Sequence, residues 1–364
     1  MDQSKKTSLA STPPAPLTWL LLGSKMGDNN QVLALAEALG WPYLSQQLHF
    51  HWYELTTNLL LKTTLAGVNL KRSDNLQPPW PELIITAGRR NEPVARWIKE
   101  KNSGNTKIVH IGRPWASLDI FDIIVTTPQY FLPQNSRVLT IDLPLHRVNP
   151  DRLATAAHAW RAQFSHLPHP WIAVLLGGNS GKYVFTQATG RRLGQLANQM
   201  AESAGGSLLI TNSARTPPPA YEACLKELDT PAHIYQWEDN DQADNPYLGY
   251  LALADKLVVT GESMSMLAEA EATGKPVYIF DPRDDSVQPW WRHAHNFRFK
   301  PLSHRLAMRF GPARMHRDVG RIQQALINSK RATWLGQQAP SDTRAKKTSD
   351  TQRAVRRIRS LFGY

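Results

Sequence analysis

The chain has 364 residues, 41% of them hydrophobic and 20% charged, which predicts two soluble globular domains and excludes a largely disordered chain. A single cysteine, Cys224, excludes an internal disulfide and favours a reducing compartment, so we expect a cytoplasmic protein. The net charge of +12 is uneven: residues 283–364 hold 18 Lys and Arg against 5 Asp and Glu, a net of +13, which leaves −1 for residues 1–282.

The N-terminal half alternates between apolar runs and helical patterns. After a disordered leader at residues 1–16, "LTWLLLG" predicts a buried strand, because charged "SKMGDNN" stands where a signal peptide would need small residues. A helix "QVLALAEALG", a strand "YLSQQLHF" and a helix near 56–67 should follow. The unit "ELIITAGRRNEPVARWIKE" and the runs "KIVHIG" and "DIIVTT" then predict a parallel sheet buried on both faces. These elements predict a Rossmann-like domain over residues 17–150.

The same alternation starts again after a Pro- and His-rich boundary at residues 144–170, which holds the helix-like "DRLATAAHAWRAQF". Strands are predicted in "WIAVLLGG", "GSLLITNSA", "AHIYQW", "KLVVTG" and "KPVYIF", with helices between them. Short connections between alternating strands and helices predict a second parallel sheet, in a domain over residues 151–335. We therefore expect an α/β protein with two Rossmann-like domains facing a cleft, followed by a basic tail over residues 336–364.

Three loops of the second domain lie where ligands bind in open α/β sheets, at the carboxyl ends of strands. The loop "GGNSGKY" brings Gly177, Gly178 and Gly181, which suits close approach to an anion but equally a simple turn. The loop "TNSARTPPP" brings Arg215, either a phosphate ligand or a solvated surface residue. In "GESMSMLAEAEA", Glu262 or Ser263 is expected to cap a helix whose first amides can hold a diphosphate. Simple packing by Met264, Leu267 and Ala268 is the alternative for that helix.

These loops carry a resemblance. "LADKLVVTGESMSMLAEAEATGKPVYIF" resembles the donor-site signature of GT-B glycosyltransferases, including the lipid-linked N-acetylglucosaminyl transferase of peptidoglycan synthesis. A fuller match is to a bacterial family related to the plant mitochondrial-fission Elm protein, whose members are called glycosyltransferases. It is carried by "GDNNQVLALAEALG", "PELIITAGRR", "LLGGNSGKY", "TNSARTP", "NPYLGYLALADKLVVTGESMSMLAEA" and "TGKPVYIF", which cover most of residues 20–281.

The resemblance implies a GT-B fold with the nucleotide-sugar donor in the second domain, where a helix start binds the diphosphate and a glutamate holds the ribose. The donor-binding residues implied are Gly177, Gly178, Asn179, Ser180, Arg215, Ser263, Met264, Ser265 and Glu269. The chain departs from the pattern at Glu262, where an aspartate is expected, and at "TTPQY" (126–130), where a Pro-His-Asp-like ending is expected.

The first domain should supply the acceptor side. An inverting transferase needs a base near the acceptor hydroxyl, and Asp28 at the end of the first strand is our catalytic candidate, with helix capping as the alternative. A lone His110 at a later strand end is the other candidate base. We expect no metal, because no DxD-type pair ends a strand, and "DPRDD" (281–285) is expected to mark a loop. The acceptor-side residues expected around Asp28 are Gly27, Asn29, Gln31 and Arg89.

The predicted function is metal-independent glycosyl transfer, with no cofactor, from a nucleotide sugar to a cell-envelope glycan or glycolipid, as in lipopolysaccharide biosynthesis. The alternatives are a non-enzymatic membrane-associated adaptor and a nucleotide-sugar epimerase of the same fold. The final "TQRAVRRIRSLFGY" has an apolar stripe at Ala354, Val355, Ile358, Leu361 and Phe362, flanked by four arginines. This pattern predicts either a helix lying on the anionic inner membrane or a helix packed on the first domain. Nucleic acid is not an expected partner, because the arginines have no regular aromatic platform.

Overall fold

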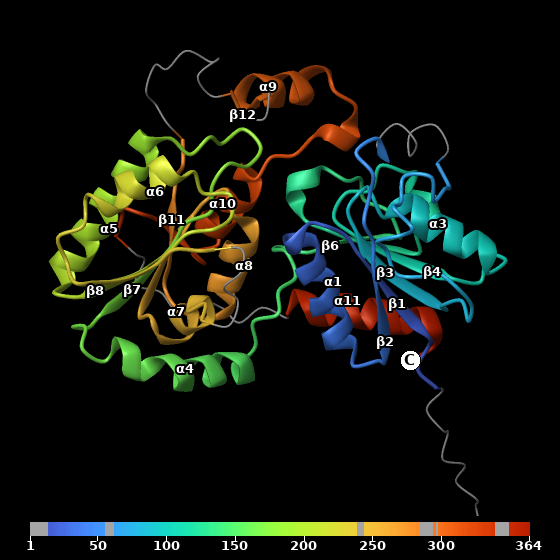
Figure 1. Cartoon of the computed structure of the whole chain (residues 1–364), viewed down its shortest axis with the longest axis horizontal. Coiled ribbons are helices and arrows are strands. Elements are labelled where there is room, and N and C mark those ends of the chain that lie inside the picture. The colour runs from blue at the N-terminus through green and yellow to red at the C-terminus, as the bar shows by residue number, and fades with distance from the viewer. Residues whose placement is uncertain (1–13, 55–61, 239–243, 284–293, 296–297, 339–348) are drawn as a thin grey trace, which may run out of the picture. The chain divides into compact units, whose positions relative to one another are not determined.

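The protein is described by a computed structural model of the chain (Figure 1), which covers residues 14–54, 62–238, 244–283, 294–295, 298–338 and 349–364. The predicted leader lies mostly outside these residues. The contacts divide the chain into two compact units. Unit 1 comprises residues 1–125, 134–139 and 348–364, and unit 2 comprises residues 126–133 and 140–347.

Unit 1 is built on a six-stranded sheet in the order β2-β1-β3-β4-β5-β6, with parallel pairing from β2 to β5. All residues of β1 and β3 are buried, since helices cover both faces, and this explains why their sequences lack alternation. The strands are β1 (Thr18–Leu22), β2 (Tyr43–Gln47), β3 (Leu83–Ala87), β4 (Lys107–Ile111), β5 (Ile123–Thr126) and β6 (Val138–Thr140). The helical segments are α1 (Met26–Leu39), α3 (Glu92–Lys101) and η1 (Leu118–Ile120), with α11 (Asp350–Arg359) and η5 (Ser360–Phe362) at the C-terminus.

The C-terminal helix α11 belongs to unit 1, where Figure 1 shows it, in red, alongside α1. Its apolar stripe is enclosed: Ala354, Val355 and Ile358 are at most 3% exposed. Arg359 donates to the carbonyl of Leu39 at 3.0 Å, at the end of α1. The membrane interpretation of this stripe is therefore wrong, because the side chains that would enter a bilayer form part of the core of unit 1.

Unit 2 contains a second six-stranded sheet, in the order β14-β11-β10-β7-β8-β9, and all its neighbouring strands run parallel. Counted in chain order, this is the 3-2-1-4-5-6 order of the Rossmann fold. The strands are β7 (Trp171–Leu175), β8 (Ser207–Thr211), β9 (Ala232–Tyr235), β10 (Lys256–Thr260), β11 (Val277–Phe280) and β14 (Thr333–Trp334). A separate antiparallel pair joins β12 (Ala294–His295) to β13 (Arg298–Phe299).

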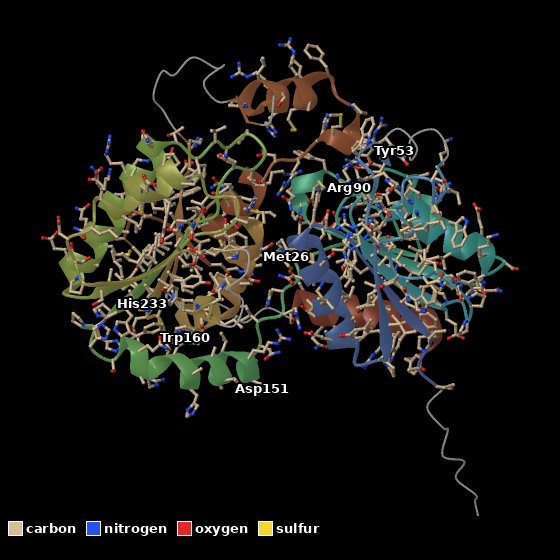
Figure 2. The ribbon with its side chains drawn as sticks, viewed as in Figure 1. Met26, Tyr53, Arg90, Asp151, Trp160 and His233 are labelled. Carbon is tan, nitrogen blue, oxygen red and sulfur yellow. The ribbon has the colours of Figure 1, made fainter. Side chains whose placement is uncertain are left out.

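Helices cover both faces of this second sheet. Alternate residues of β7 enter two different apolar clusters: Ala173 and Leu175 pack with α4, α7, α8 and α10, and Ile172 and Val174 pack with α5 and α6. Trp160 of α4, labelled in Figure 2, lies so close to α7 that a Cβ on Gly249 would be 2.6 Å from its ring. The helical segments are η2 (Pro128–Tyr130), α4 (Pro150–Phe164), α5 (Gln187–Ala204), α6 (Pro218–Leu225), α7 (Tyr247–Leu253), α8 (Met264–Ala272), α9 (Lys300–Phe310), η4 (Ala313–Met315) and α10 (Gly320–Asn328).

The α/β class with two Rossmann-like sheets is confirmed. The helix expected near 56–67 falls partly outside the described residues, and residues 62–67 form turns and bends, so the prediction is wrong there. The short β6 was not predicted, because "RVLT" offers too few apolar residues to be recognised as a strand. Among the described helices, none has both the length and the apolar character that crossing a membrane requires.

Candidate functional site

Three loops meet at the carboxyl edge of the sheet of unit 2, after β7, β8 and β10, which are neighbours in that sheet. The amide of Gly178 donates to Glu262 Oε1 at 2.6 Å, which joins the first loop to the third. The amide of Asn179 donates to the carbonyl of Arg215 at 3.1 Å, which joins the first loop to the second. The structure thus brings together the three loops that the sequence singled out separately.

The two glycines after β7 allow this close approach. A Cβ on Gly177 would lie 2.9 Å from both Ser263 Cβ and Thr260 Oγ1. A Cβ on Gly178 would lie 2.6 Å from the amide nitrogen of Thr216 and would overlap the Arg215 carbonyl. Any larger residue at either position would push the loops apart.

The other two residues predicted in this loop shape the loop itself. Asn179 accepts a hydrogen bond from the amide of Phe185 at 2.8 Å through its side-chain oxygen. Ser180 is buried and pairs its backbone with Tyr183. Both residues hold the conformation of the loop that follows the two glycines.

Glu262 is 1% exposed, and its carboxylate lies among the three loops. Its Oε1 accepts from Gly178 and also from Thr260 Oγ1 at 3.0 Å, whereas Oε2 is buried with no hydrogen-bond partner among the described residues. Burial raises the pKa of Glu262, and the Gly178 amide and the charge of Arg215 act in the opposite direction. The predicted cap is therefore wrong: Glu262 ties the loops together, and Ser263 occupies the N-cap position of α8 without a side-chain capping bond.

The start of α8 consequently has no side-chain cap from Ser263. The first amides of a helix have no intrahelical acceptor, and here the side chain of the N-cap residue makes no capping bond to them. Ser263 and Met264 are buried and Ser265 is partly exposed, so all three predicted residues lie at this helix start. Arg215 is exposed on the neighbouring loop, close enough to Glu262 to act on its pKa. Uncapped amides beside an arginine side chain form a setting that suits an anionic group.

Glu269 lies further along α8, about 8 Å from Met264 at the usual helical rise. Tyr247 of α7 donates a short hydrogen bond to Glu269 Oε2. Burial raises the pKa of Glu269 to about 7, although the hydrogen bond from Tyr247 opposes the shift. Burial and the neighbouring carboxylate also raise the pKa of Tyr247, so the phenol keeps its proton and remains the donor.

Asp28 lies in the first turn of α1 and is partly buried. Its Oδ2 is 2.9 Å from the position that a Cβ on Gly88 would take, so the carboxylate lies over the end of β3. The N-cap position of α1 is held by Lys25 and Asp28 lies inside the first turn, so the prediction that Asp28 is the N-cap is wrong.

The residues around Asp28 are mostly held by local bonds. Asn29 clamps Gly23 at the end of β1, because its side chain accepts from the Gly23 amide at 2.9 Å and donates to the Gly23 carbonyl at 2.7 Å. Gln31 donates to the carbonyl of Gly27 at 3.3 Å. The structure therefore gives Asn29 a structural role and leaves Asp28 as the carboxylate at this edge.

Arg89 follows β3 and pairs with the buried Glu54 at 3.3 Å. Arg90, labelled in Figure 2, donates to the same carboxylate at 2.7 Å, and Arg89 also lies 5.1 Å from the centroid of the Trp115 ring. The other candidate base, His110, is fully buried, 3.5 Å from Glu92. A fully enclosed imidazole has no access to an acceptor hydroxyl.

No cluster of three or more His, Cys, Asp or Glu side chains suited to a metal ion occurs in the described part of the chain. Within "DPRDD", Asp281 pairs with Arg283 in a turn-like contact, and Asp284 and Asp285 lie outside the described residues.

Several residues that build this site were not predicted from the sequence. Thr260 accepts from the Gly177 amide at 2.8 Å, and Ser213 Oγ donates to the Gly177 carbonyl at 2.6 Å. Gln323 of α10 donates to the carbonyl of Gly261 at 2.6 Å, and Tyr247 holds Glu269. Thr260 and Ser213 stand at strand ends where they could have been suspected, whereas nothing in the sequence links Gln323 or Tyr247 to these loops.

The family model described as "Mitochondrial fission ELM1" matches residues 26–362. The "Mitochondrial fission protein ELM1" of Arabidopsis thaliana is 32% identical over 250 residues, which are 60% of this chain and 56% of that protein. The chain thus spans little more than half of that relative. An uncharacterized protein of Rickettsia prowazekii (strain Madrid E) is 28% identical over 296 residues, 72% of this chain and 83% of that protein.

Solved structures that are similar to this chain have low sequence identity to it. The UDP-GlcNAc 2-epimerase from Methanocaldococcus jannaschii has a TM-score of 0.47 and 9% identity, and the match covers 94% of this chain and 99% of that one. Os79 from O. sativa, in complex with U2F and trichothecene, has a TM-score of 0.47 and 10% identity, with 95% of this chain and 100% of that one covered.

Proposed function

The chain belongs to the mitochondrial fission ELM1 family, and from this premise we propose that it transfers a sugar from a nucleotide-sugar donor to a cell-envelope glycan or glycolipid. The observation that carries the proposal is the meeting of three strand-end loops around the uncapped start of α8. A chain that needed these loops only for folding would be expected to cap the helix with Ser263, the residue that occupies its N-cap position.

The donor diphosphate would bind at the first amides of α8 and at Arg215. Amides at a helix start carry partial positive charge, and an exposed guanidinium can bind a phosphate with two hydrogen bonds. The backbone around Gly177 and Gly178 brings these groups together without side chains in the way. Glu269 would accept hydrogen bonds from the ribose hydroxyls, held in place by the phenol of Tyr247.

In the proposed reaction the bond between the sugar and the diphosphate breaks as an acceptor hydroxyl attacks the anomeric carbon. The negative charge that develops on the leaving diphosphate would be stabilised by the α8 amides and Arg215. The acceptor proton would go to Asp28, the partly buried carboxylate at the end of β3. We propose that these groups, and not a metal ion, offset the leaving-group charge, so transfer should persist in the presence of a chelator.

The acceptor class implies the location. A cell-envelope glycolipid is presented at an anionic membrane, so we propose a cytoplasmic enzyme that associates with the inner leaflet from outside the bilayer. The similarity to the mitochondrial fission protein of Arabidopsis thaliana is the reason for a second candidate function of this chain, a membrane adaptor without catalysis. The uncapped start of α8 and the neighbouring Arg215 favour the enzyme, because an adaptor has no need of either.

Thermal unfolding with a panel of nucleoside diphosphates and nucleotide sugars tests the donor site. A ligand that binds only the folded protein raises the melting temperature by mass action. At a ligand concentration of about a hundred times Kd, the free energy of unfolding rises by about 2.7 kcal/mol. Arg215→Gln should weaken that ligand about 10- to 100-fold, because a charge-assisted hydrogen bond to phosphate is lost. The matched control is Arg161→Gln, an exposed arginine of α4 in the same unit. No melting shift with any nucleotide, or equal shifts in both variants, would reject the proposed donor site.

A further inference from the structure

Large apolar side chains are exposed on α9 and on the turn that follows it. Leu306 is 48% exposed, Phe310 73% and Met315 50%. Figure 1 shows α9 standing away from the sheet of unit 2. Arg305, Arg309 and Arg314 each immediately precede one of these apolar residues in the sequence and are also exposed. We call these six residues the α9 surface.

The spacing places the two kinds of side chain in adjacent rows. Leu306 and Phe310 are four residues apart and share one helix face, and Arg305 and Arg309 form the neighbouring row. The guanidinium of Arg309 lies 5.2 Å from the centroid of the Phe310 ring. An incoming partner would therefore meet aromatic, aliphatic and cationic groups together.

The surrounding sequence adds positive charge and no negative charge. Residues 286–317 contain seven Lys and Arg and no Asp or Glu. This segment supplies a large part of the basic excess of the C-terminal region. The arginines of α11 cannot act together with an exposed apolar stripe, because the stripe of that helix is buried. Only an anionic partner suits a surface of this charge.

We propose that the α9 surface docks the protein on an anionic phospholipid bilayer. Leu306, Phe310 and Met315 enter the boundary between headgroups and acyl chains, and the arginines pair with lipid phosphates. A nucleic acid would match the arginines, but it offers nothing to the exposed Leu306 and Met315. The inference extends the membrane part of the proposed function and is independent of the donor site.

Co-sedimentation of the full chain with vesicles tests the inference, using phosphatidylcholine mixed with phosphatidylglycerol and phosphatidylcholine alone. The unaltered protein should bind the anionic vesicles, and less so at high salt. The double change Arg305→Gln, Arg309→Gln should weaken partitioning about 25-fold, since each basic residue near an anionic surface contributes about fivefold. Leu306→Ser with Phe310→Ser should weaken it about tenfold or more, because less apolar surface leaves water.

Matched controls distinguish the effect of the α9 surface from the effects of net charge and of exposed apolar side chains elsewhere. Arg161→Gln with Arg356→Gln removes two exposed arginines elsewhere, and Leu70→Ser removes a leucine that is 61% exposed in unit 1. Both controls should pellet like the unaltered chain, and all variants should keep the same melting temperature and the same nucleotide-induced shift. The inference is overturned if the unaltered chain stays in solution with anionic vesicles, or if the α9 and control variants bind alike. It is equally overturned if the α9 changes abolish binding to duplex DNA and leave vesicle binding intact.

Discussion

Replacing Glu269 by glutamine should make the stability of the protein less sensitive to pH. The side chain is partly buried on α8 and bonded to Tyr247, and burial raises its pKa from 4.5 to about 7. Glutamine keeps an oxygen that can accept the hydrogen bond from Tyr247, but it cannot ionise. The variant therefore removes the cost of burying a charge with little change in shape.

The magnitude follows from the two pKa values. Below pH 4.5 Glu269 is protonated in the folded and the unfolded chain, and its titration does not change stability. Between pH 4.5 and about 7 the folded protein keeps a proton that the unfolded chain has lost, so the free energy of unfolding falls by about 1.4 kcal/mol per pH unit. Above pH 7 both states are ionised and the loss stays near 3 kcal/mol. From pH 5 to pH 8 the difference in the free energy of unfolding between Glu269→Gln and the unaltered chain should grow in favour of the variant by at most about 2.5 kcal/mol. This corresponds to about 5–10 °C in melting temperature.

Differential scanning calorimetry at pH 5 and pH 8 measures this change. The control Glu202→Gln, on the exposed side of α5, should show the same melting temperature relative to the unaltered chain at both pH values. If Glu269→Gln behaves like that control, or loses stability as the pH rises, the buried carboxylate does not titrate as proposed. The raised pKa of Glu269 would then no longer support its proposed role as a ribose ligand.

Three further changes test other parts of the account. Gly178→Ala should lower stability by about 1–3 kcal/mol and abolish the nucleotide-induced melting shift, because the new Cβ overlaps the Arg215 carbonyl; unchanged nucleotide binding would contradict the interlocked loops. Asp28→Asn should reduce sugar transfer about a hundredfold or more and leave donor affinity intact, and full transfer by this variant would remove Asp28 as the base. Ile358→Ala should cost about 2–4 kcal/mol in denaturant unfolding, because this side chain is fully enclosed in unit 1; a cost near zero would restore the surface-helix interpretation of α11.

Strand and helix periodicity was enough to predict both parallel sheets. Runs such as "LTWLLLG" and "ELIITAG" are apolar on both sides, and Rossmann-like sheets bury both sides of each strand. The location of the site was also predictable, because the ends of parallel strands gather at one edge, and Gly178, Arg215 and Ser263 followed such ends.

Side-chain partners across the loops were not predictable. Glu262 looked like a helix cap, yet it bonds an amide 84 residues away in the chain, a pairing that depends on strand order in the sheet. Tyr247 and Gln323 reach the site from helices that follow other strands, so their contribution depends on how those helices pack. The apolar stripe of α11 and its flanking arginines did not identify a membrane-binding helix for the same reason. An amphipathic helix packs equally well on a protein core, and residue spacing alone does not distinguish membrane binding from packing.

Acceptor-dependent turnover is the measurement that tests the proposed glycosyl transfer most directly. The full chain is incubated with each nucleotide sugar of the panel and a bacterial envelope lipid extract, and mass spectrometry follows the donor. The account predicts release of a nucleoside diphosphate only when the extract is present, with a sugar-bearing lipid product, and a strong reduction of both signals in Arg215→Gln. Every donor remaining intact would contradict transfer and favour the adaptor, and conversion of the donor into an epimeric nucleotide sugar without lipid product would show an epimerase instead.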